Sequence, residues 1–165
     1  MKLLIAYARK SGCTREMAEL LAGELFRHDV TLADLSDTRP DPTQFDYVVL
    51  GTSIRMNRAV RSLRHYVAKH AKALCAVPHT LFLCCAFSDQ FDHYLGVAFP
   101  RELIETAERR VYFGGDLTLA RQRGTDKIIT RMLRNGILES EDEDAVLPTL
   151  LPEHVRALAD HLRKK

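Results

Sequence analysis

The stretch Tyr47-Val-Val-Leu-Gly-Thr-Ser-Ile-Arg-Met-Asn57 decides the fold of this 165-residue chain. Its apolar half predicts a buried strand, which ends at Gly51 and gives way to a small polar loop. A similar break lies near the N-terminus, where the apolar run 2–8 is followed by Arg9-Lys-Ser-Gly-Cys-Thr14. Two polar loops that follow buried strands are what a phosphate-bearing cofactor needs at the carboxyl edge of a parallel sheet.

Strand and helix patterns alternate along the whole chain. Strands are predicted over 2–8, 30–35, 47–50, 80–86 and 111–114, and helices over 14–26, 60–74, 92–109 and 153–162. Pro100 interrupts the third helix and suits the first turn of a second segment. Because right-handed crossovers put helices on both faces, we expect an α/β, doubly wound, five-stranded parallel sheet in one domain spanning 1–165. The pattern leaves the order of the strands open.

Composition is that of an ordinary globular protein, with 46% hydrophobic and 28% charged residues. No apolar run approaches the ~20 residues of a membrane span, and no signal-peptide pattern follows Met1, so a cytoplasmic protein is expected. The cysteines are Cys13, Cys75, Cys84 and Cys85, none in a C-x-x-C pair. Buried free thiols are the expected state, and no metal site is expected.

Positive charge is concentrated on part of the chain, although the net charge is only +2. No acidic residue lies between Asp46 and Asp89, whereas that interval holds Arg55, Arg58, Arg61, Arg64, Lys69 and Lys72. One positive face is therefore expected, suited to a small anionic partner rather than to nucleic acid.

Several common phosphate-binding motifs are missing from the sequence. There is no G-x-x-x-x-G-K-[ST] and no G-x-G-x-x-G, which argues against a P-loop nucleotidase and a dinucleotide site. A response-regulator receiver has a similar layout, but it requires an aspartate at the end of the third strand, where Gly51 and Thr52 stand here.

The first loop has the chemistry for a phosphate. Ser11 and Thr14 offer hydroxyl donors, Gly12 permits close backbone approach, and the loop amides lie at a helix start. The alternative is that both hydroxyls only cap the helix.

Three segments together resemble the flavodoxin family: Tyr7-Ala-Arg-Lys-Ser-Gly-Cys-Thr14, Phe45-Asp-Tyr-Val-Val-Leu-Gly-Thr-Ser-Ile-Arg55 and Ser88-Asp-Gln-Phe-Asp-His-Tyr94. The resemblance implies a flavodoxin-like three-layer α/β/α sandwich that binds FMN. It places the FMN phosphate on the first loop and the isoalloxazine ring between the other two. The cofactor-binding residues that it implies are Ser11, Gly12, Cys13, Thr14, Thr52, Ser53, Ile54, Arg55, Met56, Asn57, Phe87, Ser88, Asp89, Phe91 and Tyr94.

More narrowly, Ser-Gly-x-Thr-Arg-Glu16 and Gly-Thr-Ser-Ile-Arg55 resemble the flavodoxin-type, menaquinone-dependent protoporphyrinogen oxidases. That resemblance implies hydride transfer from a porphyrinogen to FMN and electron transfer to a quinone. In such a reaction Arg55 and the neighbouring Arg58 are expected to pair with propionates or with flavin. A second hypothesis is an electron carrier that docks on a redox protein, although such carriers are typically acidic. A third is a regulatory module without flavin, because Met56 and Asn57 stand where those oxidases tend to carry Tyr and Gly. Because Met56 and Asn57 are not aromatic, the residue that stacks on the isoalloxazine ring is then expected to be Phe87, or one of Phe91 and Tyr94. The alternative is that Phe91 and Tyr94 are core residues.

Residues 121–137 predict a basic amphipathic helix. Thr125 suits its start and Gly136 its end, with Ile128, Ile129, Met132 and Leu133 beside Lys127, Arg131 and Arg134. Such a helix can lie on an anionic membrane surface, and the resembling oxidases carry a basic segment here that is associated with the membrane. The alternative is an ordinary packed surface helix.

Overall fold

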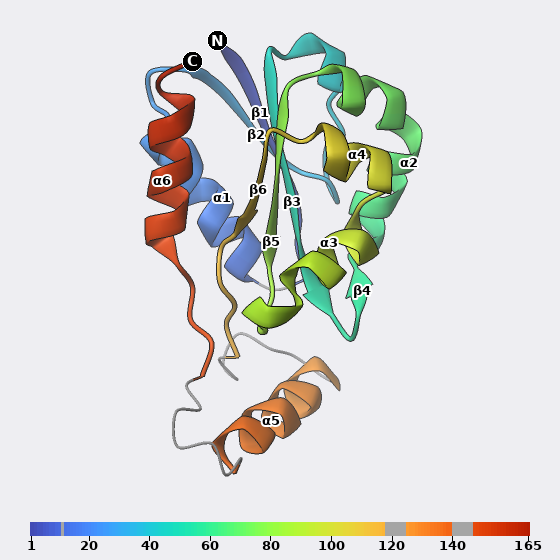
Figure 1. Cartoon of the computed structure of the whole chain (residues 1–165), viewed down its shortest axis with the longest axis vertical. Helices are drawn as coiled ribbons and strands as arrows, with labels where there is room; N and C mark the ends of the chain where they lie inside the picture. The colour runs from blue at the N-terminus through green and yellow to red at the C-terminus, as the bar shows by residue number, and fades with distance from the viewer. Residues whose placement is uncertain (11, 118–124, 140–146) are drawn as a thin grey trace.

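The fold is a parallel sheet with helices on both faces, as the computed structural model shows for residues 1–10, 12–117, 125–139 and 147–165, apart from the side chains at 125, 126 and 129 (Figure 1). The strands are β1 (Lys2–Ala8), β2 (Asp29–Asp34), β3 (Tyr47–Arg55), β5 (His79–Cys84) and β6 (Arg109–Tyr112). They lie in the order β2-β1-β3-β5-β6, and all pairs along this path are parallel. This order, left open by the sequence, is that of the flavodoxin-like doubly wound sheet.

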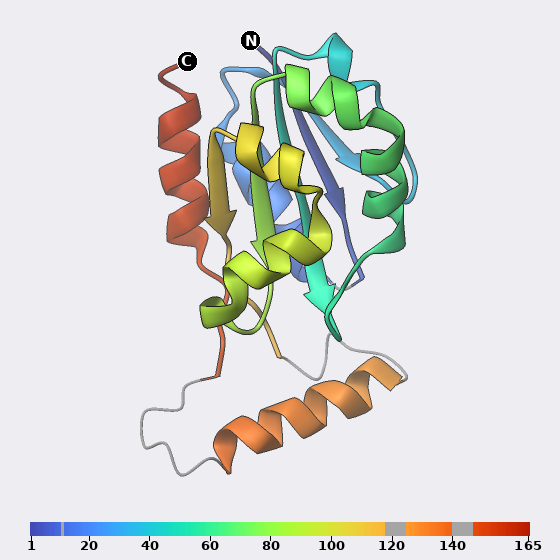
Figure 2. The same cartoon turned by 45° about the vertical axis from the view of Figure 1, so that its right-hand side comes forward.

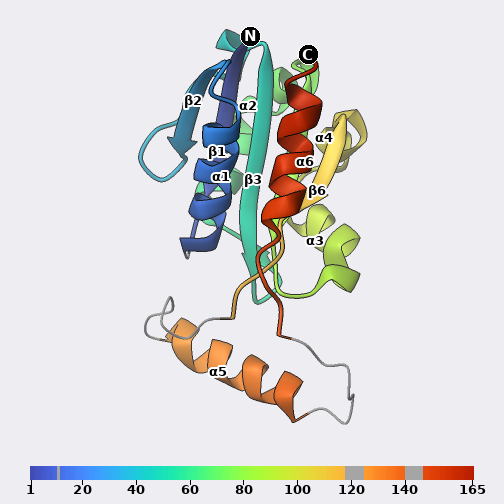
Figure 3. The same cartoon turned by 90° about the vertical axis from the view of Figure 1, so that its left-hand side faces the viewer.

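Two helical layers enclose the sheet. Helices α1 (Gly12–Glu24) and α6 (Pro152–Leu162) cover one face, and α2 (Arg61–Ala76), α3 (Phe91–Ala98) and α4 (Arg101–Thr106) cover the other (Figures 1 and 3). The three-layer sandwich and its five-stranded parallel sheet are therefore confirmed, with the short strand β4 (Arg58–Ala59) added as an antiparallel hairpin on β3.

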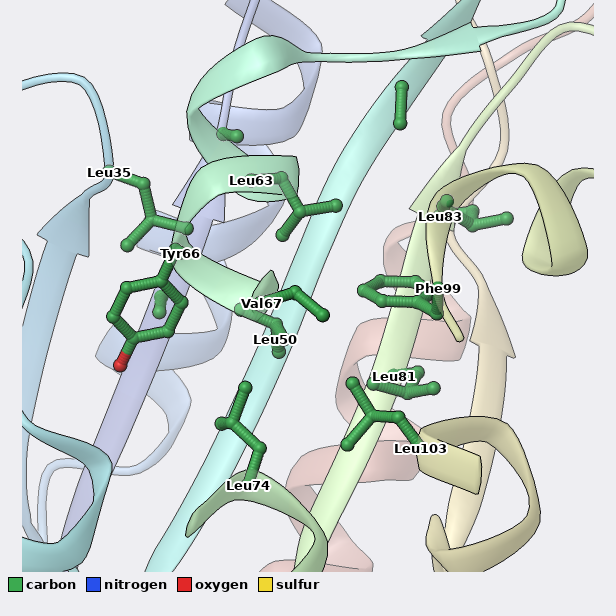
Figure 4. Close-up of a cluster of buried hydrophobic side chains, with 14 of the residues drawn as sticks. Leu35, Leu50, Leu63, Tyr66, Val67, Leu74, Leu81, Leu83, Phe99 and Leu103 are labelled. Atoms are coloured by element: carbon green, nitrogen blue, oxygen red, sulfur yellow. The ribbon is translucent and has the colours of Figure 1, made fainter. Parts of the chain in front are cut away.

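Each face of the sheet has its own core because successive strand residues point to opposite sides. Leu50, Leu81 and Leu83 pack with Leu63 and Leu74 of α2 (Figure 4). On the other face, side chains of β1, β3 and β5 pack against those of α1 and α6. Strands β1, β3 and β5 are buried on both sides, which explains their nearly continuous apolar sequences.

Two predicted boundaries were wrong in ways that bear on the site. The third strand does not end at Gly51: it continues through Thr52 and Ser53 to Arg55, because it keeps pairing with β5 and then turns back as a hairpin. The helix predicted over 92–109 is divided at Pro100, as the sequence indicated, but Pro100 is the N-cap of α4 rather than a residue of its first turn, and α4 ends at Thr106.

Close packing requires a glycine at position 51. A Cβ at this position would overlap the ring of Phe82, which itself packs on Phe113 with 4.7 Å between ring centroids. Gly51→Ala should therefore lower the free energy of unfolding by about 1–3 kcal/mol through overpacking. Gly96→Ala, in the open space on α3, is the matched control and should be neutral or stabilising by up to about 1 kcal/mol. Equal urea midpoints for the two variants would contradict this account.

Candidate functional site

The predicted cofactor loops meet at the carboxyl edge of the sheet. There β1 leads into α1, β3 into the hairpin with β4, and β5 into the short helix η2 (Ser88–Gln90), while β6 is followed by Phe113, Gly114 and Gly115. Helix α5 (Thr125–Leu138) lies beyond these strand ends, across the edge of the sheet (Figure 2). In doubly wound sheets ligands bind at this edge, near the point where the strand order reverses, which here lies between β1 and β3.

A cavity of about 90 Å³ lies between these loops. Its lining includes seven of the predicted residues: Cys13, Ser53, Ile54, Arg55, Met56, Phe87 and Tyr94. Six further lining residues come from the ends of β5 and β6 and the segments that follow them, and two from α5: Cys84, Cys85, Ala86, Gly115, Asp116, Leu117, Thr130 and Leu133. Five segments far apart in the sequence thus converge on one space.

Helix α5 closes this cavity. Thr130 is only 1% exposed, Leu133 contributes to the lining, and Arg55 Nη1 donates a hydrogen bond to Thr130 Oγ1 at 3.4 Å. Small-molecule sites usually measure about 300–1,000 Å³. A ring system of flavin size therefore needs more space than the cavity offers with α5 in this position, and the Arg55–Thr130 hydrogen bond, at 3.4 Å, is itself a weak restraint on the helix.

The tip of the hairpin between β3 and β4 has an unusual backbone. Met56 and Asn57 have φ angles of 49° and 56°, and they join the cross-strand pair Arg55 and Arg58 as a two-residue turn. Asn tolerates this region well, whereas Met at positive φ is strained. The ring of His93 on α3 holds the turn through a 2.8 Å hydrogen bond between its Nε2 and Asn57 Oδ1. The strained turn thus stands at the mouth of the cavity, held from one side.

Two buried hydroxyls near the cavity lack partners. Thr14 Oγ1 and Ser53 Oγ make no hydrogen bond to any described residue, although the Cys84 thiol lies close to Thr14. The two residues are 0% and 5% exposed. A buried hydroxyl without a partner costs about 1–3 kcal/mol, so these groups fit a site that an absent polar ligand completes. Gly12 and Cys13 lie beside Thr14 in the first turn of α1, and Ser11 lies outside the described residues.

Thr52 differs from Ser53, although the sequence suggested a hydroxyl pair. Thr52 is fully buried in β3, and its Oγ1 donates to the carbonyl oxygen of Ala8 at 3.1 Å, with a longer contact to the Ser53 carbonyl. Its hydroxyl therefore stabilises the β1–β3 pair rather than facing the cavity. Thr52 as a cofactor contact stays a prediction, and only its backbone is available for that role.

Three aromatic residues follow β5, namely Phe87 before η2 and Phe91 and Tyr94 on α3. Phe87 and Tyr94 line the cavity, and Phe91 packs edge-on against Tyr112, with 6.0 Å between ring centroids. Both Phe91 and Tyr94 also pack against the core on this face of the sheet. Ser88 and Asp89 are exposed in η2. Of the two candidates on α3, geometry therefore favours Tyr94 for a ring contact.

Asp116 was not predicted as a site residue, yet it lines the cavity and accepts a contact from the Cys13 thiol at 3.9 Å. The available signal was the Gly114-Gly115-Asp116 segment directly after the last strand, at the same edge as the other loops. Gly115 is required because a Cβ there would overlap the backbone of Cys85. The close approach of these two segments brings the carboxylate to the site.

Two of the cavity thiols, those of Cys84 and Cys85, are poor nucleophiles. Burial raises the pKa of the Cys85 thiol to about 12 and raises the pKa of Cys84 further above its usual range. At neutral pH both stay protonated, so they offer apolar, polarisable walls rather than reactive thiolates. Within the described ranges, no three His, Cys, Asp or Glu side chains are grouped as a metal site.

Comparison with known proteins identifies the family. A family model described as a flavodoxin domain matches residues 4–144. The solved flavodoxin of Streptococcus pneumonia TIGR4 superposes with a TM-score of 0.59 over 99% of both chains, at 15% identity. The Fusobacterium nucleatum flavodoxin bound to flavin mononucleotide gives 0.53 over 99% of this chain and 97% of that one, at 12% identity. At these identities the structures show a shared fold.

A curated relative is more similar in sequence. The protoporphyrinogen IX dehydrogenase [quinone] of Escherichia coli strain K12 is 34% identical over 86 residues. The match covers 50% of this chain and 47% of that protein, so it spans about half the length of each. With the family model covering most of the chain and the orphaned hydroxyls fitting a polar ligand, the chain belongs to the flavodoxin domain family, and FMN is its cofactor.

Proposed function

We propose that the protein is an FMN-dependent oxidoreductase that oxidises a porphyrinogen and delivers the electrons to a quinone. The observation that carries this proposal is the hairpin of β3 and β4. Its residues 53–56 line the cavity described above, and it also borders a surface that holds Arg58, Arg61 and Arg64. The partial match to the Escherichia coli dehydrogenase supports the reaction class. An anionic, largely apolar substrate such as a porphyrinogen suits apolar lining residues that stand beside guanidinium groups.

The residues for holding FMN follow from the site. The first loop, including the Thr14 hydroxyl, would bind the phosphate, and Ser53 to Asn57 with Phe87 and Tyr94 would enclose the ring. When bound, FMN supplies a hydride acceptor that can pass electrons onward singly or in pairs. The protein positions the FMN, sets the charge around it and excludes water from it.

Three groups of this chain have defined tasks in the proposed reaction. The Arg55 guanidinium adds positive charge at the mouth of the cavity, which favours an anionic substrate. Among the described residues lining the cavity, Asp116 is the carboxylate, and its oxygens can accept the proton that a porphyrinogen releases. With α5 moved outward to admit the ring, Leu133 and Thr130 would still cover the site and limit the access of water.

Contact with a membrane belongs to this proposal because quinones are lipid-soluble. Ile128 and Met132 on α5 are 61% and 69% exposed, and Lys127 and Arg131 are exposed on the same helix. Apolar side chains among cations suit the surface of an anionic bilayer. Within the described residues, no helix has the length and apolar character to cross a membrane. We propose that α5 rests on the bilayer surface.

An electron carrier is the alternative function, and steady-state assays separate the two. FMN-loaded protein, kept anaerobic and present in catalytic amounts, should oxidise protoporphyrinogen over many turnovers only when a menaquinone analogue is present, and porphyrin fluorescence should rise in proportion to the quinone consumed. A carrier would instead be reduced rapidly by a flavodoxin reductase and would show no porphyrinogen-dependent quinone reduction. That second pattern would contradict the oxidase proposal.

A further inference from the structure

A second cavity lies next to the first and shares the hairpin of β3 and β4 with it. It encloses about 610 Å³, within the usual range for small-molecule sites. Ser53, Arg55 and Met56 line both cavities. The remaining lining of the second cavity, which we call the arginine groove, comes from the first loop, β4 and the start of α2: Lys10, Arg58, Ala59, Val60, Arg61 and Arg64.

The arginine groove is lined by five cations and no acid. Among the described residues, Arg58, Arg61 and Arg64 have no ion-pair or hydrogen-bond partner, and their side chains are exposed. Exposed cations are common and are usually just hydrated, so charge by itself decides little. What is unusual here is that like charges converge on a concave surface, where their repulsion is relieved by an anion.

The start of α2 also favours an anion in the arginine groove. A helix N-terminus carries partial positive charge and favours acidic side chains in its first turn. Helix α2 has none there, its N-cap Val60 provides no side-chain hydrogen bond, and Arg61 occupies the first position. The helix thus directs unsatisfied amides and an arginine to the same groove, an arrangement that stabilises a bound anion rather than the helix itself.

Ser53 provides an independent sign of a ligand. Its side chain lines the groove, is 5% exposed, and its hydroxyl has no hydrogen-bond partner among the described residues. A hydroxyl buried between two cavities can serve a molecule in either. Its position places a hydrogen-bonding group where the two spaces meet.

We propose that the arginine groove is the subsite for the carboxylates of the substrate, with Arg61 and Arg64 as its main binding residues. The inference rests on the proposed function, in which the substrate is a tetrapyrrole with two carboxylate side chains. Arg61 and Arg64 are three residues apart on α2, so their guanidinium groups can reach neighbouring carboxylates from one helix face. The tetrapyrrole ring then points toward the flavin cavity through the shared wall of Ser53 and Met56.

The test uses FMN-loaded protein and two probes that differ only in charge, mesoporphyrin IX and its dimethyl ester. The double substitution Arg61→Gln and Arg64→Gln should weaken binding of the diacid roughly tenfold or more. Affinity for the ester and for FMN should stay unchanged, and the salt dependence of diacid binding should shrink. Arg61→Lys with Arg64→Lys keeps the charge and should retain part of the affinity. Lys69→Gln with Lys72→Gln, on the same helix but outside the groove, is the matched control.

Each outcome decides the proposal. Equal losses for diacid and ester, or no loss at all, would overturn it. A fall in FMN affinity with unchanged riboflavin affinity would also overturn it, because the groove would then hold the cofactor's phosphate. If the diacid binds through Arg61 and Arg64 but no turnover with quinone occurs, the subsite stands and the oxidase proposal fails.

Discussion

Thr14→Val is expected to weaken FMN binding by about ten- to 150-fold while leaving riboflavin binding unchanged. Hydrogen bonds to charged groups contribute about 1.5–3 kcal/mol, and Val matches Thr in shape without the hydroxyl. Riboflavin lacks the phosphate, so it reports only on the ring site. Fluorescence quenching titrations of the two ligands measure the difference directly.

The same substitution should not destabilise the FMN-free protein. Apart from the nearby Cys84 thiol, Thr14 Oγ1 is buried without a partner among the described residues, so its replacement by a methyl group should be neutral or stabilising by about 1 kcal/mol. Thr80→Val is the matched control, because this buried hydroxyl lies 2.9 Å from the Tyr47 hydroxyl, at the other end of β5. It should lower stability and leave FMN affinity intact. Equal loss of FMN and riboflavin binding in Thr14→Val would show that the hydroxyl does not serve the phosphate.

Replacing Lys127, Arg131 and Arg134 with Gln should weaken binding to anionic vesicles by roughly 100-fold. Each cation near an anionic surface contributes about 1 kcal/mol, and all three lie on α5. Cosedimentation with phosphatidylglycerol-containing vesicles measures the partition coefficient. Binding of the unmodified protein should also fall with added salt, because exposed charges are screened over about 10 Å at 0.1 M.

Two further variants test whether vesicle binding depends on α5 itself or only on the net charge of the protein. Replacing Lys69, Lys72 and Arg110 with Gln removes the same charge from exposed positions elsewhere and should change vesicle binding much less. Ile128→Ser with Met132→Ser should weaken the part of binding that survives high salt, since apolar burial is not screened. FMN affinity should stay constant throughout. Equal losses for both charge-removal variants would exclude α5 as the membrane contact.

The layers of the fold could be predicted from the sequence because they depend on local patterns. Continuous apolar runs marked the buried strands, and steps of three and four marked the helices that pack on them. The end of β3 could not be predicted in the same way. Thr52 and Ser53 look like loop residues in isolation, but pairing with β5 and the Thr52 bond to Ala8 keep them in the strand.

The site was only partly predictable for a related reason. The residues next to the strand ends were found, since parallel strands bring their carboxyl ends to one edge. Asp116 and the α5 residues Thr130 and Leu133 were missed because only tertiary packing brings them to the cavity. The closure of the cavity and the partnerless Thr14 hydroxyl are likewise properties of the folded chain.

An anaerobic single-turnover experiment tests the central claim most directly. FMN-loaded protein is mixed in excess with protoporphyrinogen, because each flavin accepts only one electron pair and several pairs must leave a porphyrinogen to form a porphyrin, and the visible flavin absorbance is followed before and after a menaquinone analogue is added. The account predicts that the flavin absorbance is lost as porphyrin fluorescence appears, and that the quinone restores it. Flavin absorbance that porphyrinogen leaves unchanged, in protein shown to hold FMN, would contradict the account.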